Sequence, residues 1–202
     1  MRQNRNQKIL RMVEMAMLLA LVIVLQIFGG MFKIGPFSLT LVLIPVVIGS
    51  IVLGPISGAV LGAAFGIVVL VQCISGIDVG GNLLWSINPF LTALICLGKG
   101  AAAGFVPGVI YRAMTKKAQS AGLRLTAAIF AGVSAPIVNT GLFLVGLSVF
   151  FNSTLIAWAG GTNVLVYIIT GLVGINFLIE FVINLVVSPA IATIVNVVNK
   201  RF

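Results

Sequence analysis

Residues 43–66 read LIPVVIGSIVLGPISGAVLGAAFG and contain no charged side chain. The stretch consists of two apolar segments that meet at Gly54-Pro55, a pair that is typical of a tight turn. Its second half is rich in small residues, among them Gly58, Gly62 and Gly66. Small side chains let two helices approach closely inside a membrane. The stretch therefore predicts two membrane-spanning helices joined by a short turn.

The whole chain has the same character. Of its 202 residues, 60% are apolar and only 7% are charged, whereas soluble domains carry about 25% charged residues. A soluble fold of this size could not cover its apolar residues with so few polar ones. One span and its connection use roughly 25–35 residues, so the chain has room for about six spans. We predict an all-α membrane protein with a single domain, residues 1–202.

The apolar runs place these spans at about 12–28, 39–53, 58–74, 87–111, 125–150 and 164–195. The last run is long enough to tilt or to project beyond the bilayer. We expect Pro189 to kink or break it, because proline cannot donate a helical hydrogen bond. The polar or glycine-rich segments 29–38, 75–86 and 151–163 are predicted to be loops at one end of the bundle.

The basic residues predict the orientation. Ten of the twelve Lys and Arg residues lie in the amino-terminal leader, in segment 112–124 or at the carboxyl end, while the outer loops hold only Lys33. Such a bias marks the cytoplasmic side of a membrane protein. We therefore expect both termini to be cytoplasmic, in the plasma membrane of a prokaryote. The net charge of +9 comes from these flanks, so it does not indicate a nucleic-acid partner.

The sequence argues against an enzyme, a metal site or a bound cofactor. It has no histidine, which removes Ser-His and Cys-His nucleophiles and histidine-ligated zinc. The only acidic residues, Glu14, Asp78 and Glu180, are far apart in the chain, which is unlike a site of several carboxylates. Cys73 and Cys96 do not form a CxxC motif, and we expect them to be small buried thiols.

Lys99 and Glu180 are predicted to lie near the middle of the membrane. Each is between twelve and sixteen residues from the outer end of its span, and a charge at this depth costs about 2.5–3.5 kcal/mol. One interpretation is a structural ion pair between two helices. Another is that Lys99 binds a substrate carboxylate, with Glu180 as its resting partner or a hydrogen-bond acceptor. A third places Glu180 in lipid as a neutral acid.

Polar side chains within the other spans predict a ligand pocket. Asn176, Glu180 and Asn184 are spaced by four residues, so they form one stripe that should face the bundle interior. Near the outer end lies a second set, below two glycine-rich loops: Asn82, Trp85, Asn88, Thr92 and Asn139. The alternatives are hydrogen bonds between helices for each asparagine and a membrane-interface position for the tryptophan.

The first span carries Ala16 and Ala20, which are spaced to give a flat strip for another helix, either inside the bundle or on a partner. With the basic leader, the stretch 43–66 and the segment 87–104 (INPFLTALICLGKGAAAG), this pattern resembles the substrate-specific S-components of energy-coupling-factor (ECF) vitamin transporters. The resemblance covers nearly the whole chain.

This resemblance implies a high-affinity binding subunit that takes up a vitamin or related micronutrient from outside the cell. It would dock through Ala16 and Ala20 onto a membrane coupling subunit, which two cytoplasmic ATPases drive, and topple in the bilayer to release its cargo. Loops 29–38 and 75–86 would gate a pocket between the fourth, fifth and sixth spans. The chain has no GxxxxGK[ST] motif, so partner subunits would supply ATP hydrolysis.

The substrate is less constrained. Two Trp and two Tyr offer few stacking rings, while Asn, Thr and a deep Lys99 suit an aliphatic acid that forms hydrogen bonds. We therefore predict pantothenate. Riboflavin, a folate, a pyridoxine-type vitamin and a queuosine precursor stay open, whereas cobalt and nickel would need histidine or carboxylate ligands. The alternative from another class is an autonomous channel or facilitator for a small solute.

Overall fold

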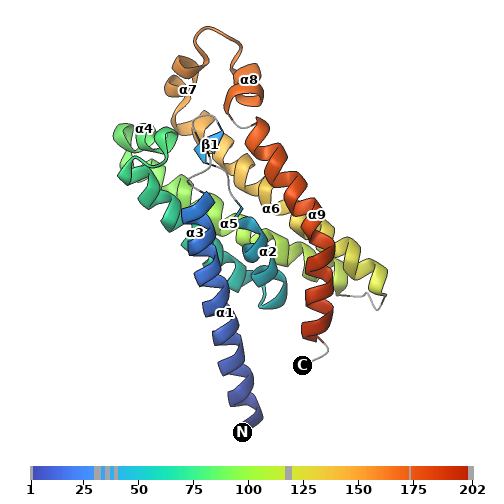
Figure 1. Ribbon diagram of the computed structural model, residues 1–202. Helices are drawn as coiled ribbons and strands as arrows, with labels where there is room; N and C mark the ends of the chain where they lie inside the picture. Colours follow the sequence, from blue (N-terminus) through green and yellow to red (C-terminus); the bar gives the residue numbers. More distant parts are fainter. Residues whose placement is uncertain are drawn as a thin grey trace.

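The computed structural model describes residues 2–29, 33–34, 37–38, 41–116, 120–172 and 174–199, and the statements below concern these residues. Helices dominate the chain (Figure 1). In chain order the elements are α1 (Arg2–Gly29), β1 (Lys33–Ile34), β2 (Phe37–Ser38), α2 (Leu43–Val52), α3 (Pro55–Ser75), α4 (Val79–Ile87), α5 (Pro89–Thr115), α6 (Ala121–Phe150), α7 (Asn152–Ala159), α8 (Val164–Tyr167), the π-helix η1 (Ile168–Leu172) and α9 (Gly174–Asn199).

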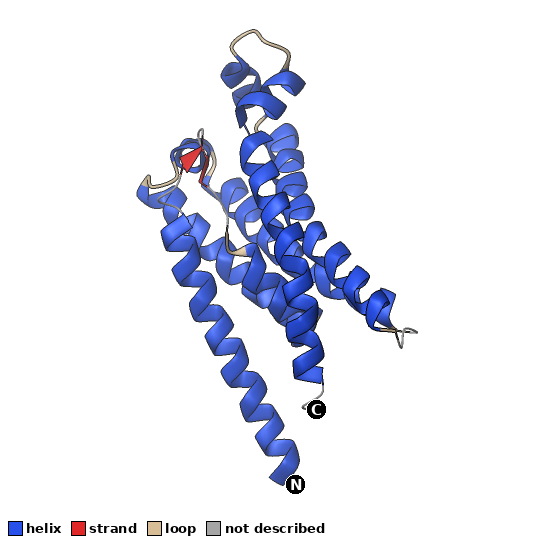
Figure 2. Cartoon of the chain, turned by 45° about the vertical axis from the view of Figure 1, so that its right-hand side comes forward, coloured by secondary structure: helices blue, strands red, loops and turns tan. Residues whose placement is uncertain are grey.

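The bundle has two distinct ends. The start of α1 and the end of α9 lie together at one end, which we call the terminal end (Figure 2). The short helices α4, α7 and α8 lie at the opposite end, which we call the α7 end. The ends of the described chain are thus on the same side, as the prediction of an even number of spans requires.

Four helices are long and apolar enough to cross a membrane: α1 from Gln7, α3, α5, and α6 from Gly122. They correspond to the first, third, fourth and fifth predicted spans. The predicted second span contains the shorter α2, and the apolar helix at the sixth position is Asn176–Ile191 within α9. The structure therefore supports a membrane protein built almost entirely of helices, while the count of six spans stays a prediction.

Helices α3 and α5 pack with their backbones in direct contact. A Cβ atom added at Gly62 would clash with the carbonyl oxygen of Gly100, and one added at Gly58 would clash with that of Gly104. Neither carbonyl can move without moving its helix. Only glycine fits at these positions, which confirms that the small residues in the second half of the stretch 43–66 form a helix-packing face.

The buried apolar residues form two separate cores. The larger one joins α1, α2, α3, α5, α6 and α9 and includes Leu61, Phe65 and Ala135. The smaller one lies at the α7 end and consists of Leu84, Ile95, Phe143, Leu147, Phe151 and Leu155. On α6, Asn139 lies one turn from Ala135 of the first core and one turn from Phe143 of the second. A polar residue thus occupies the boundary between the cores.

Two segments that were predicted as loops form helices instead. In segment 75–86, Asp78 starts α4 because its Oδ1 accepts a hydrogen bond of 2.7 Å from the backbone N–H of Gly81. In segment 151–163, α7 buries Leu155 and Ala159. Each helix gains its stability by adding side chains to the smaller core, which a count of polar and glycine residues does not reveal.

The last predicted span is divided. Helix α8, η1 and α9 occupy its place. At its start, the segment Val164–Gly171 is bent by 83° relative to the preceding helix Asn152–Ala159. Helix α9 continues through Pro189, so this proline does not break it, while the alternative of a kink stays a prediction. In the predicted first loop, β1 pairs with β2 in antiparallel fashion, with Lys33 opposite Ser38. The rest of segment 30–40 lies outside the described residues.

Candidate functional site

Asn139 is the centre of the candidate site. It lies on α6, its side chain is only 4% exposed, and its Oδ1 has no hydrogen-bond partner among the described residues. Leaving a buried acceptor unpaired costs about 1–3 kcal/mol. An asparagine that stays in such a position is expected to have a partner in another state of the molecule, and a bound ligand can supply it.

The predicted polar stripe of α9 faces the bundle interior. Asn176, Glu180, Asn184 and Ser188 follow one another at intervals of four residues, and all four are buried. The Nδ2 of Asn184 donates a hydrogen bond of 2.8 Å to the carbonyl oxygen of Glu180. Glu180 is 4% exposed, which excludes the interpretation that it faces lipid.

The contact between α6 and α9 fixes their register. A Cβ atom at Gly132 would meet the Oγ of Ser188, so the two antiparallel helices are in close contact there. Towards the α7 end, Asn139 lies seven residues beyond Gly132 and Glu180 lies eight residues beyond Ser188. Because both helices rise about 1.5 Å per residue, Asn139 and Glu180 are at nearly the same level.

Lys99 approaches this level from α5. Its Nζ is 4.8 Å from the centroid of the Phe143 ring, a cation–π distance. Phe143 is one turn beyond Asn139 on α6, so the ammonium group and the unpaired Oδ1 of Asn139 are near the same part of the helix. Phe143 was not among the predicted site residues. Its only signal is the spacing of four residues from Asn139.

A small cavity adjoins Lys99. It has a volume of about 30 Å³ and is lined by polar and apolar side chains that include Thr92, Cys73, Cys96 and Asp78. This volume is about that of one water molecule. Both cysteines are free and buried, as predicted. Thr92 and Lys99, two of the predicted site residues, therefore line one small cavity together.

Two of the other predicted residues, Asn82 and Asn88, have hydrogen bonds within the protein. Asn88 starts α5, because its Oδ1 accepts a hydrogen bond from the N–H of Leu91 and its carbonyl oxygen accepts one from Thr92 Oγ1. The Nδ2 of Asn82 donates to the carbonyl oxygen of Cys73 at 2.8 Å. Trp85 is half-buried on α4. That these residues contact a ligand stays a prediction.

Gln26 and Gln72 connect α1 to α3. The Nε2 of Gln26 donates to the Oε1 of Gln72 at 2.9 Å, and the Nε2 of Gln72 donates to the carbonyl oxygen of Gln26 at 3.1 Å. Sequence analysis identified neither as a partner of the other. Amide hydrogen bonds between spans contribute about 0.6 kcal/mol on average, so this pair fixes the position of α1 near the α7 end.

Comparison with known proteins establishes the family. The family model described as "ECF transporter, substrate-specific component" matches residues 10–192. The chain belongs to this family. A relative, the pantothenic acid transporter PanT of Lactococcus lactis subsp. cremoris (strain MG1363), is 29% identical over 191 residues, which cover 88% of this chain and 89% of PanT. The protein is thus a substrate-specific component of an ECF transporter, a transport subunit rather than an enzyme.

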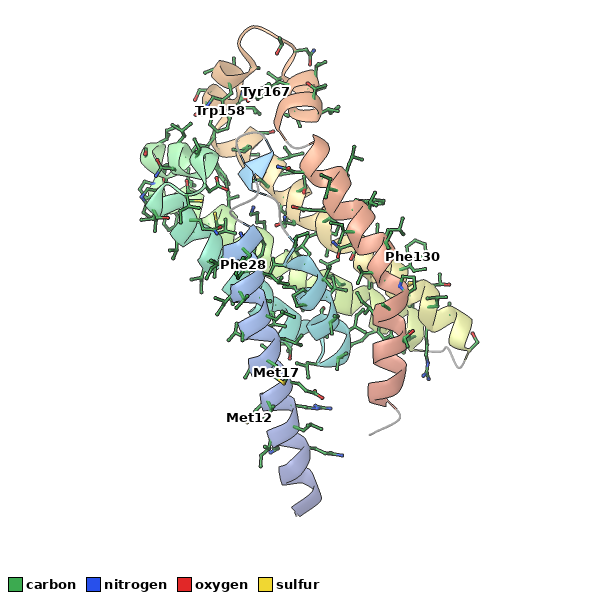
Figure 3. The ribbon with its side chains drawn as sticks, viewed as in Figure 1. Met12, Met17, Phe28, Phe130, Trp158 and Tyr167 are labelled. Carbon is green, nitrogen blue, oxygen red and sulfur yellow. The ribbon has the colours of Figure 1, made fainter. Side chains whose placement is uncertain are left out.

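In this substrate-specific component, α1 exposes an apolar face. Ala16 and Ala20 are exposed, so packing inside the protein's own bundle does not explain their spacing. Met12, Met17 and Phe28 are 71%, 69% and 60% exposed on the same helix (Figure 3). The strip that the two alanines form is therefore accessible to lipid or to another membrane helix.

Proposed function

We propose that this substrate-specific component binds pantothenate between α5, α6 and α9, near the α7 end. The observation that carries the proposal is the position of the Lys99 ammonium beside Phe143, one turn from Asn139, whose side-chain oxygen Oδ1 has no partner among the described residues. Pantothenate has a carboxylate, an amide and two hydroxyl groups. A single cation and buried amides match this set of groups, because a charged hydrogen bond to a carboxylate is about twice as strong as a neutral one.

The relative PanT supports this choice over the other vitamins, since its name gives pantothenic acid as its substrate. In the proposed complex, Lys99 binds the carboxylate and Asn139 accepts a hydrogen bond from an amide or hydroxyl group. Glu180, which lies level with Asn139, accepts a second one. Thr92 lines the space next to Lys99. Asn82, Trp85 and Asn88 frame the site through α4 and the start of α5.

The proposed orientation has six spans, cytoplasmic termini and the α7 end outside the cell, in a prokaryotic plasma membrane. It is supported by the position of both ends of the described chain on one side of the bundle. The leader of α1 and the residues around the α5–α6 connection carry basic side chains, including Arg11, Arg112, Lys116 and Arg124. A vitamin would then reach the proposed site around Lys99, Asn139 and Glu180 from outside the cell.

The proposed partners are a membrane coupling subunit and two cytoplasmic ATPases. The family assignment supports a coupling module, since a substrate-specific component is one part of a transporter. We infer that Ala16 and Ala20 on the exposed face of α1 form the docking strip. Small residues let a partner helix approach the α1 backbone closely, where dispersion contacts stabilise association in lipid.

Isothermal titration calorimetry of the purified protein tests the site. Pantothenol, in which a neutral CH₂OH replaces the carboxylate, is the matched ligand. We expect Lys99→Met to weaken pantothenate binding about tenfold more than pantothenol binding, since one charged hydrogen bond is lost. Lys116→Met, which removes an exposed charge at the terminal end, is the control and should change neither affinity. Equal losses for both ligands in Lys99→Met would assign Lys99 a structural role.

A further inference from the structure

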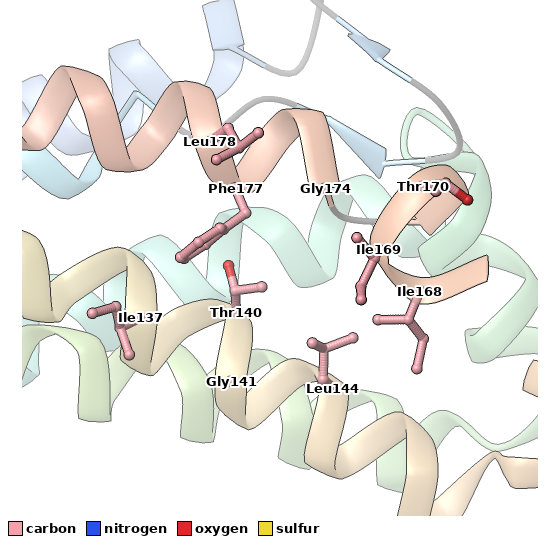
Figure 4. A pocket seen from close by; sticks show the side chains of 10 residues that line it. All are labelled: Ile137, Thr140, Gly141, Leu144, Ile168, Ile169, Thr170, Gly174, Phe177 and Leu178. Carbon is pink, nitrogen blue, oxygen red and sulfur yellow. The ribbon is translucent and has the colours of Figure 1, made fainter. Parts of the chain in front are cut away.

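A second cavity lies between α6, η1 and α9 (Figure 4). Its volume is about 570 Å³, within the range of about 300–1,000 Å³ that is common for small-molecule sites. Ile137, Gly141 and Leu144 line it from α6, and Phe177 and Leu178 from α9, with Ile169 of η1 at one end. Among the described residues that line it none is charged, and the two polar ones are Thr140 and Thr170.

This cavity is distinct from the polar site. Counted from the Gly132 contact, Gly141 lies two residues beyond Asn139 and Phe177 lies three residues beyond Glu180, so the cavity is about 3–5 Å nearer the α7 end than the polar site. The lining residues of α6 also follow the positions 137, 140, 141 and 144, a helix face different from that of Asn139 and Phe143. The two helices thus have a polar side towards the bundle interior and an apolar side at this cavity.

The cavity opens towards the outside of the bundle. Ile137, Ile169 and Leu178, which line it, are all exposed apolar residues. Helix α6 is a candidate span and Asn176–Ile191 is an apolar helix, so the opening lies at membrane depth. At this depth the surrounding medium is hydrocarbon. Apolar cavities exclude water and bind apolar molecules, so an uncharged hydrocarbon is the occupant that fits this lining.

The size of the cavity also selects the occupant. Its α6 lining extends over residues 137–144, about two helical turns. A partner helix, about 10 Å across, would need a longer groove along its axis. Gly141 borders this space, and no atom lies within 4 Å of the position where its Cβ would be. An inserted chain would restore the dispersion contacts that the empty lining lacks.

We propose that one acyl chain of a membrane phospholipid, from the leaflet at the α7 end, occupies the cavity between α6, η1 and α9. The chain fills the apolar side of the α6–α9 contact, while the polar side binds the transported solute. This proposal does not depend on the identity of that solute.

The test uses the purified protein and a phosphatidylcholine with a photoreactive diazirine in one acyl chain. After irradiation, mass spectrometry of the peptides locates the cross-links. We expect cross-links to concentrate on residues 137–144 and 174–178. In Gly141→Phe, whose ring would fill the cavity, they should fall about tenfold there, because the contacts of the displaced methylene groups are lost. Gly141→Leu is a second, smaller filling variant.

Gly98→Phe is the matched control, since Gly98 is exposed on α5 and its added Cβ would also have no atom within 4 Å. It should leave the cross-links at α6 and α9 unchanged. Cross-links spread evenly over all exposed faces would show only the lipid that surrounds any membrane protein, and would overturn the proposal. Localised cross-links that persist unchanged in both Gly141 variants would overturn it as well.

Discussion

Asn139 shows how a single side chain connects the fold to the function. The amide lies between two apolar cores, and its Oδ1 has no partner within the described part of the chain. A residue selected for stability alone would be apolar at this position, because an unpaired buried acceptor is costly. We interpret the amide as a group that is paired only when a ligand is bound.

The first prediction concerns this residue. Asn139→Leu should lower the affinity for pantothenate about tenfold, since one ligand hydrogen bond is lost, while the free energy of unfolding changes by less than about 1 kcal/mol. Calorimetry and thermal melting measure the two effects. Asn152→Leu, on the exposed start of α7, is the control. A large loss of stability without a change in affinity would make Asn139 a structural residue.

The sequence predicts the burial and helix-capping roles of individual residues better than their contacts between helices. Burial of the Asn176, Glu180 and Asn184 stripe follows from the cost of polar groups in lipid, and the structure confirms it. The helix-capping role of Asn88 has a local signal, the following Pro89 at the first helical position. The contact of Lys99 with Phe143 has no comparable signal, because it depends on how α5 packs against α6.

Among the elements, the α3–α5 pair forms the rigid centre of the bundle. Gly62 and Gly100 approach so closely that each occupies the space of the other's missing side chain. Close backbone packing replaces the hydrophobic effect as the source of helix association in lipid. Helix α5, which carries Thr92 and Lys99, is thereby held in a fixed position against α3.

Gly62→Ala should therefore destabilise the protein by about 1–3 kcal/mol, because the new methyl group meets the carbonyl oxygen of Gly100 and the backbone must shift. Gly98→Ala is the matched control on the same helix pair, and its methyl group would enter open space. The two variants are compared by thermal unfolding in one detergent. Equal melting temperatures would show that the contact is looser than described.

Elements with a long apolar run were predictable, and short ones were not. The spans that correspond to α1, α3, α5 and α6 follow from length and hydropathy. Helices α4 and α7 are 9 and 8 residues long, too short to be recognised by composition among glycine and polar residues. Their stability comes from contacts with the smaller core, which are formed only in the folded bundle.

At the scale of the whole molecule, the substrate-specific component presents two different surfaces. At the α7 end, short helices lie over the proposed ligand site. Along one side of the bundle, α1 exposes Ala16 and Ala20. Ligand binding and partner docking would then use separate parts of the fold. Helix α1 is linked to the bundle through Gln26 and Gln72, so its remaining face is available to a partner.

Ala16→Trp and Ala20→Trp should each abolish capture of the coupling subunit, because an indole ring would separate the two helix backbones. Pantothenate affinity should stay unchanged, since α1 contributes none of the proposed ligand contacts. Val60→Trp, at an exposed site on α3, is the control for bulk on the surface. Co-purification with the coupling subunit measures docking. Normal capture of the coupling subunit by both Ala16→Trp and Ala20→Trp would show that the docking surface lies elsewhere.

Native mass spectrometry of the purified protein with an equimolar mixture of pantothenate, riboflavin, folate and pyridoxine tests the central claim most directly. We predict one pantothenate per wild-type chain, no other vitamin adduct, and loss of the adduct in both Asn139→Leu and Lys99→Met. Exclusive binding of a different vitamin, or a pantothenate adduct that both variants retain, would contradict it.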